Sequence, residues 1–176
     1  MNITLHRTTL MVCMLAGALA LTIALVAAKD VSAAPSPERA GGATQISGLG
    51  SYDASCDPTS VDPDASYAIL MTGDLQGCLY TYIETAQPSP SGTYRETGTE
   101  LFVGSTSEGA GTFETTYRFE AKYEDVTDPA TEIFGRCQHP IVEGSGTGSF
   151  EGVSGILLFK DDIEAGNFPY RGHLRG

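Results

Sequence analysis

The sequence predicts an all-β domain, most simply an eight-stranded antiparallel barrel. The clearest observation is a strict alternation over residues 112–123. Apolar, aromatic or small side chains fill every second position there, namely Phe113, Thr115, Tyr117, Phe119, Ala121 and Tyr123. Charged and polar residues lie between them. This pattern is typical of an antiparallel strand with one buried face and one face in water.

Five further segments have a strand-like composition and cover residues 67–71, 78–85, 94–103, 155–160 and 170–174. Turn-forming residues such as Gly, Pro, Asn and Asp separate them. Short strands at this spacing predict about seven or eight strands in a barrel or a sandwich. Closely spaced glycines favour the barrel, because its strands must coil sharply to close: Gly146, Gly148, Gly152 and Gly155.

The N-terminus has the pattern of an export signal. Arg7 precedes an apolar run over residues 10–28, and small residues follow as far as Ala34. We therefore predict a signal peptide over residues 1–34, a flexible tether over 35–44 and a single β-barrel domain over 45–176. An apolar run of this length can also span a bilayer, so an uncleaved membrane anchor is the alternative. Both readings predict a secreted or cell-envelope protein.

The charge balance excludes one class of partner. The chain has 10 Lys and Arg residues against 22 Asp and Glu residues, a formal net charge of −12. Because nucleic-acid binding depends on neutralising phosphates with basic side chains, no nucleic-acid partner is expected. A domain of this size can bury about two thirds of the surface that its unfolded chain exposes.

Three cysteines follow the predicted signal: Cys56, Cys78 and Cys137. Export into an oxidising compartment predicts a disulfide, and three cysteines allow three pairings. Cys78 and Cys137 both lie in strand-like surroundings shortly after a glycine, so we predict that they pair and that Cys56 is the spare thiol. No basic residue flanks Cys56 to lower its pKa, which disfavours a catalytic thiol.

The known chemical motifs are missing or incomplete. Cys137 and His139 are two potential zinc ligands two residues apart, but a zinc site needs two more, so no metal site is predicted. The glycines between Gly146 and Gly152 lack the dinucleotide-binding spacing, and no serine-hydrolase elbow is present. We predict no cofactor.

One buried carboxylate is expected. In segment 94–103, alternation places Glu100 on the same side as Phe102, and a phenylalanine favours the interior. A carboxylate inside a barrel needs a partner such as Arg136, or a raised pKa. A structural Glu–Arg pair and an acid/base group are the two interpretations. An aromatic lining is expected from Tyr80, Tyr82, Tyr117, Phe119 and Tyr123, unless these rings simply fill the core.

The C-terminal part resembles a known superfamily. Residues 144–162 (GSGTGSFEGVSGILLFKDD) followed by Tyr170-Arg-Gly-His173 are similar to the closing hairpin of the allene oxide cyclase and dirigent barrel superfamily, in particular its small exported bacterial members. Residues 73–77 and 98–102 fit the same pattern of glycine-marked strands. The resemblance implies a calycin-like, eight-stranded antiparallel barrel with an apolar cavity, in which members guide cyclisation or radical coupling. The matching positions are mostly structural glycines, so no functional residue carries over.

These observations give three functional hypotheses. The first is an exported barrel that binds a small apolar ligand in its interior or mouth, with five candidate residues: Tyr82, Glu100, Tyr117, Phe119 and Arg136. The second is a cyclase or isomerase that confines its substrate, with Glu100 as the candidate catalytic residue. The third is a non-catalytic extracellular structural domain. A membrane contact is expected only through an uncleaved N-terminal segment, and the oligomeric state stays open.

Overall fold

The computed structural model describes residues 42–61 and 63–176. The predicted signal peptide and residues 35–41 of the predicted tether lie outside these described residues. No helix within the described ranges has the length and apolar character needed to cross a bilayer.

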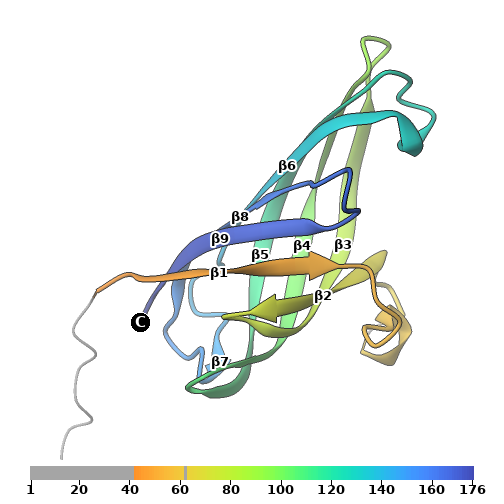
Figure 1. Ribbon diagram of the computed structural model, residues 1–176. Helices are drawn as coiled ribbons and strands as arrows, with labels where there is room; N and C mark the ends of the chain where they lie inside the picture. The colour runs from red at the N-terminus through yellow and green to blue at the C-terminus, as the bar shows by residue number, and fades with distance from the viewer. Residues whose placement is uncertain (1–41, 62) are drawn as a thin grey trace, which may run out of the picture. The chain divides into compact units, whose positions relative to one another are not determined.

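The described residues fold into an antiparallel β-barrel (Figure 1). Its strands are β1 (Thr44–Ser51), β2 (Tyr67–Gly73), β3 (Gln76–Pro88), β4 (Thr93–Thr106), β5 (Gly109–Tyr123), β6 (Glu132–Pro140), β8 (Ser154–Lys160) and β9 (Phe168–Arg175). Each strand pairs with its neighbour in the order β1-β2-β3-β4-β5-β6-β8-β9, and β9 pairs with β1 to close the ring. A short strand β7 (Thr147–Gly148) pairs with the start of β5. The predicted eight-stranded antiparallel barrel is therefore confirmed.

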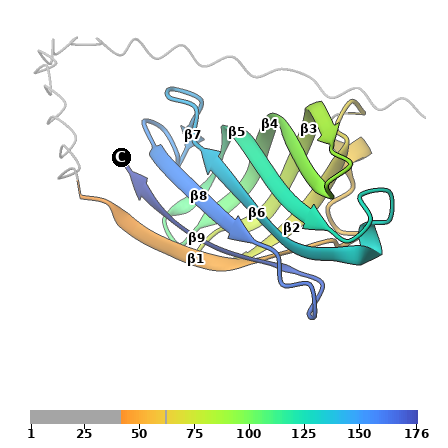
Figure 2. The ribbon, with the colours of Figure 1, turned by 90° about the horizontal axis from the view of Figure 1, so that it is seen from above.

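Long hairpins form one side of the barrel. Strands β4 and β5 pair without interruption from Thr93 opposite Lys122 to Thr106 opposite Gly109. In the view of Figure 2, β1 and β9 lie across from β4 and β5, as expected for a closed ring of strands. The predicted alternation of β5 is confirmed, because Phe113, Thr115, Tyr117 and Ala121 are all buried.

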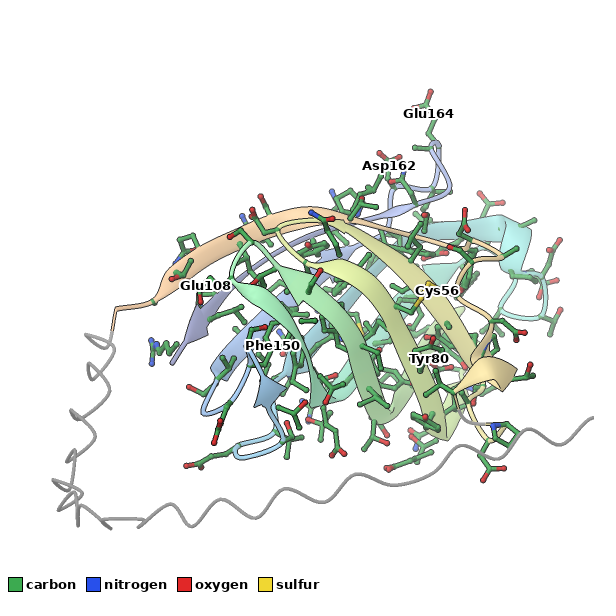
Figure 3. All side chains as sticks on the ribbon, turned by 90° about the horizontal axis from the view of Figure 1, so that it is seen from below. Cys56, Tyr80, Glu108, Phe150, Asp162 and Glu164 are labelled. Carbon is green, nitrogen blue, oxygen red and sulfur yellow. A yellow bond between two sulfur atoms is a disulfide. The ribbon has the colours of Figure 1, made fainter. Side chains whose placement is uncertain are left out.

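Aromatic rings fill the interior at one end of the barrel. Phe102 and Phe113 stack with ring centroids 4.9 Å apart, and Phe150 packs edge-on against both rings, 5.6 and 5.1 Å away. All three side chains are almost fully buried. Phe150 comes from the segment between β7 and β8, which folds under this end (Figure 3). Such ring pairs contribute about 0.5–1.5 kcal/mol each beyond the area that they bury.

A second apolar cluster lies outside the barrel wall. Strand β3 is apolar on both faces: Leu79 and Thr81 are buried in the interior, whereas Tyr80 belongs to a separate cluster with Cys56 and Ala68. Cys56 lies in the β1–β2 loop, whose described residues 52–61 and 63–66 include the part that packs on this outer face. Figure 3 shows Cys56 and Tyr80 on the same side of the barrel.

The predicted Cys78–Cys137 disulfide is wrong. Cys78 is bonded to Cys56, with Cα atoms 5.5 Å apart, and Cys137 is a buried free thiol. Cys137 belongs to the interior cluster, whereas Cys78 packs in the outer one. Strands β4 and β5 also separate β3 from β6 in the sheet. The bond instead holds the β1–β2 loop against the outer face of β3.

Substitution Cys56→Ser should lower the free energy of unfolding by about 3 kcal/mol, the loop-closure value for a bridge between residues 22 apart. Chemical denaturation with and without reductant measures the loss. The reductant should destabilise the wild type and leave Cys56→Ser unchanged. A silent Cys56→Ser substitution would show that Cys56 is the unpaired cysteine after all.

Candidate functional site

A cavity of about 480 Å³ opens at the end of the barrel opposite the phenylalanine cluster. Its walls come from the interior faces of the strands and from the ends of β1, β5 and β8 at the barrel mouth. Seven aromatic residues line it: Tyr52, Tyr67, Tyr94, Phe119, Tyr123, Phe159 and Phe168. The cavity volume falls within the range of small-molecule sites. In Figure 3, Glu164 marks the β8–β9 loop at this end.

A hydrogen-bonded cluster around Glu100 lies inside the barrel. Glu100 on β4 is only 3% exposed, and its neighbours across the sheet are Thr81 on β3 and Thr115 on β5. The hydroxyl of Thr81 donates to Oε1 at 3.2 Å, and that of Thr115 donates to Oε2 at 2.6 Å. His139 Nδ1 on β6 lies 2.5 Å from the same Oε2. These donors satisfy a carboxylate that burial would otherwise destabilise.

His139 lies in the cavity wall, and its second ring nitrogen is buried. Only 4% of the surface of His139 is exposed, and the residue lines the cavity. Its ring is held between Tyr117, stacked at 6.1 Å, and Phe159 at 4.5 Å. Nε2 is buried and has no hydrogen-bond partner in the described structure. In the tautomer in which Nδ1–H donates to the Glu100 carboxylate, Nε2 is an acceptor, which can take a hydrogen bond from a ligand.

A second buried carboxylate, Glu96, holds two tyrosines. It is 7% exposed and accepts hydrogen bonds from the hydroxyls of Tyr94 at 2.6 Å and Tyr117 at 2.7 Å. Burial raises the pKa of both tyrosines, and the hydrogen bond to Glu96 raises it further. Both hydroxyls therefore remain protonated donors at physiological pH.

Two carboxyl groups, Glu132 and Asp161, lie side by side at the cavity mouth. A Cβ at Gly135 would meet carboxyl oxygens of both, so the two groups flank the same backbone position. Burial raises the pKa of Glu132 to about 7, and the neighbouring Asp161 raises it through a hydrogen bond and through its charge. Burial also raises the pKa of Asp161. The pair therefore retains protons well above the usual range of carboxyl groups.

The structure brings together only some of the predicted site residues. Glu100 and Phe119 line the cavity. Tyr117 lies behind this wall, where it binds Glu96 and stacks on His139. Tyr82 packs in the cluster outside the barrel, together with Tyr80. Neither of these β3 tyrosines lines the cavity.

Arg136 is not the partner of Glu100. It lies exposed outside the barrel, where its guanidinium forms an ion pair with Glu120 at 2.9 Å. Successive residues of a strand face opposite sides, so Arg136 points outward while Cys137 and His139 point inward. The spacing of Cys137 and His139 was the available signal for a histidine facing the interior. Within the described residues, no group of three His, Cys, Asp or Glu side chains could hold a metal ion.

Comparison of the chain with protein-family models, with curated proteins and with solved structures finds no match.

Substitution Glu100→Gln should lower the free energy of unfolding by about 1–3 kcal/mol, since the amide NH₂ replaces an acceptor and leaves a buried donor unsatisfied. Glu114→Gln, on the exposed face of the adjacent strand β5, is the control and should change stability by less than about 0.5 kcal/mol. Urea denaturation of both variants measures the difference. Equal, small effects would mean that the Glu100 cluster contributes nothing to stability.

Glu132→Gln should alter how stability depends on pH. The folded protein keeps the Glu132 proton to about pH 7, whereas the unfolded chain releases it near the ordinary value of 4.5. The folded state thus binds more protons in this window, so this contribution is complete below pH 4.5 and is lost as pH rises through 7. At this partly exposed site, screened by water, it amounts to about 1 kcal/mol.

Thermal denaturation of wild type and Glu132→Gln at pH 4 and pH 8 measures this effect. The two proteins should be about equally stable at pH 4, and the variant should be the more stable at pH 8. Glu151→Gln, an exposed substitution near the opposite end of the barrel, is the control. If the difference in stability between wild type and Glu132→Gln is the same at pH 4 and pH 8, the raised pKa of Glu132 is contradicted.

Proposed function

We propose that this protein binds a small, mostly apolar ligand in the open end of its barrel. The observation that carries this proposal is the cavity of about 480 Å³, lined by seven aromatic residues with a few polar groups among them. Sites for small molecules typically combine apolar walls with a small number of placed polar groups. The phenylalanine cluster closes the other end, so a ligand would enter through the mouth.

The polar groups suggest how a ligand is oriented. Glu96 and Glu100 are occupied by donors from the protein itself, whereas His139 Nε2 has no partner in the described structure. A buried polar atom without a partner costs free energy, which a ligand donor would recover. The apolar body of the ligand then packs against the rings of Tyr67, Phe119 and Phe159.

Export is part of the same proposal. The Cys56–Cys78 disulfide is consistent with an oxidising compartment outside the cytoplasm. The apolar N-terminal run would supply the export signal. A ligand-binding barrel in that setting would capture its ligand outside the cell or in the envelope.

An isomerase or cyclase is the second candidate, and the free His139 Nε2 favours it. Glu100 orients the ring through Nδ1, so Nε2 could act as a general base toward a confined substrate. Glu100 would then be a positioning residue behind the histidine rather than the group that touches the substrate. Its removal would abolish turnover and leave binding intact.

Native mass spectrometry of the protein from its exporting host tests ligand binding directly. Extra mass that disappears on denaturation identifies a captured compound. Incubation of that compound with fresh protein separates the two candidates: conversion to an isomer of equal mass, lost in Glu100→Gln, supports the enzyme. Recovery of the unchanged compound supports binding alone, and a bare mass with concentration-dependent self-association supports a structural domain.

Phe119→Ala should weaken binding of the fluorescent probe N-phenyl-1-naphthylamine about tenfold, because one wall of the cavity loses its ring. Fluorescence titration measures the affinity. Tyr82→Ala removes a ring from the outer cluster and is the matched control, with unchanged affinity expected. If Tyr82→Ala weakens binding and Phe119→Ala does not, the probe binds elsewhere.

A further inference from the structure

The charged groups that line the cavity all have the same sign. Four carboxyl groups contribute to the wall, from Glu96, Glu100, Glu132 and Asp161, and no lysine or arginine is among the lining residues of the described structure. Glu96 and Glu100 accept hydrogen bonds on both of their oxygens, which is the pattern of ionised carboxylates. The donors to Glu96 are neutral hydroxyls. Apart from His139, which contacts Glu100, no basic side chain of the described residues lies among these carboxyl groups.

The rings of the cavity wall meet edge to face. Tyr52 packs against Phe168 at 5.2 Å with nearly perpendicular planes, and against Tyr67 at 6.1 Å. Tyr94 meets Phe119 at 6.2 Å and Tyr123 at 6.3 Å in the same manner. Perpendicular rings expose π faces between them, and a π face attracts a cation. Organic ammonium ions are commonly bound by such boxes of aromatic rings.

We propose that the cavity binds an organic ammonium ion with an apolar body, its charge placed at the Glu132–Asp161 pair and its body against the aromatic rings. This proposal rests on the proposed ligand-binding function and specifies its ligand class. Glu132 and Asp161, which we call the mouth pair, are the better binding position for the ammonium group. Neither carboxyl forms an ion pair with a lysine or arginine in the described structure. The Glu100 and Glu96 carboxylates, in contrast, are already surrounded by donors.

His139 supplies an independent indication that the cavity is a binding site. Its buried Nε2 lacks a partner among the described residues, so the cavity wall has an unused ring nitrogen as well as acidic groups. In the tautomer that donates through Nδ1, this nitrogen is an acceptor, which suits a ligand that carries N–H or O–H donors. The net charge of −12 adds a long-range attraction for cations that approach the barrel.

The mouth pair should make binding sensitive to pH. Besides one another, the titratable groups that interact with Glu132 and Asp161 are Tyr52, Tyr123 and, for Asp161, the buried Cys137. Burial raises the pKa of Tyr52, and it raises that of Tyr123 to about 12, so both remain neutral. Ionisation of Glu132 near pH 7 therefore adds negative charge that nothing at the mouth offsets. Affinity for an ammonium ion should rise between pH 5 and pH 8.

The test uses three probes of similar shape and different charge: 2-(1-naphthyl)ethylammonium, 2-(1-naphthyl)ethanol and 3-(1-naphthyl)propionate. Calorimetric titration of the folded protein at pH 8 should give an affinity for the ammonium probe at least about tenfold above the other two. At pH 5 the ratio between the affinity for the ammonium probe and that for the alcohol should be smaller. The alcohol should bind equally at both values.

Two variants test where the ammonium group of the probe binds. The double substitution Glu132→Gln and Asp161→Asn should reduce the affinity for the ammonium probe about tenfold, to that of the alcohol, whose binding should not change. Glu151→Gln, an exposed change near the other end of the barrel, controls for net charge and should leave both affinities unaltered. Because both mouth residues are partly exposed, circular dichroism should show an intact fold.

The outcomes separate the two proposals. If the alcohol or the propionate binds as tightly as the ammonium probe, the cationic ligand class is wrong and the ligand-binding function stands. If the ammonium preference persists in the double variant, the charge is not placed at the mouth pair. If none of the three probes binds and native mass spectrometry shows the bare chain, the ligand-binding function itself is overturned.

Discussion

Closure of the sheet is the constraint on which the rest of this structure depends. Because β9 pairs with β1 and β4 pairs with β5, every second residue of each strand points into one interior of limited volume. That interior is filled by Phe102, Phe113 and Phe150 at one end. At the other end the same inward positions carry carboxyl groups, hydroxyls and a histidine. The inner part of the site is therefore a consequence of which side chains occupy the inward positions, and the loops at the mouth add Tyr52, Val126, Pro129 and Asp161.

The interior carboxylates persist only because neighbouring strands supply their donors. Desolvation of an unpaired carboxylate costs several kcal/mol, so Glu100 depends on Thr81 and Thr115, which flank it in register on β3 and β5. His139 completes the cluster from β6. The same arrangement fixes the imidazole and leaves its outer nitrogen free. Stability of the fold and chemistry of the cavity thus rest on one set of hydrogen bonds.

The sequence was sufficient to predict which side chains face the interior where a strand had one clearly apolar face. The alternation of β5 and the inward position of Glu100 beside Phe102 are both confirmed. It was insufficient for β3, which is apolar on both faces because the β1–β2 loop covers its outer side, so Tyr80 and Tyr82 were placed inside. The same loop brings Cys56 to Cys78. Strand β1 was not predicted, and β6 was indicated only by the strand-like surroundings of Cys137, without bounds, so the opposite orientations of Arg136 and His139 were not assigned.

Barrels of similar shape differ in function through the residues that line them, so the fold alone selects no ligand. In this barrel the lining combines two properties that exclude many ligands. Aromatic walls disfavour small hydrated ions, and four carboxyl groups with no lysine or arginine among the described lining residues disfavour anions. What remains is a molecule with an apolar body and hydrogen-bond donors or positive charge. The selectivity that we propose for this cavity follows from Glu100, His139 and the Glu132–Asp161 pair, all of which line it.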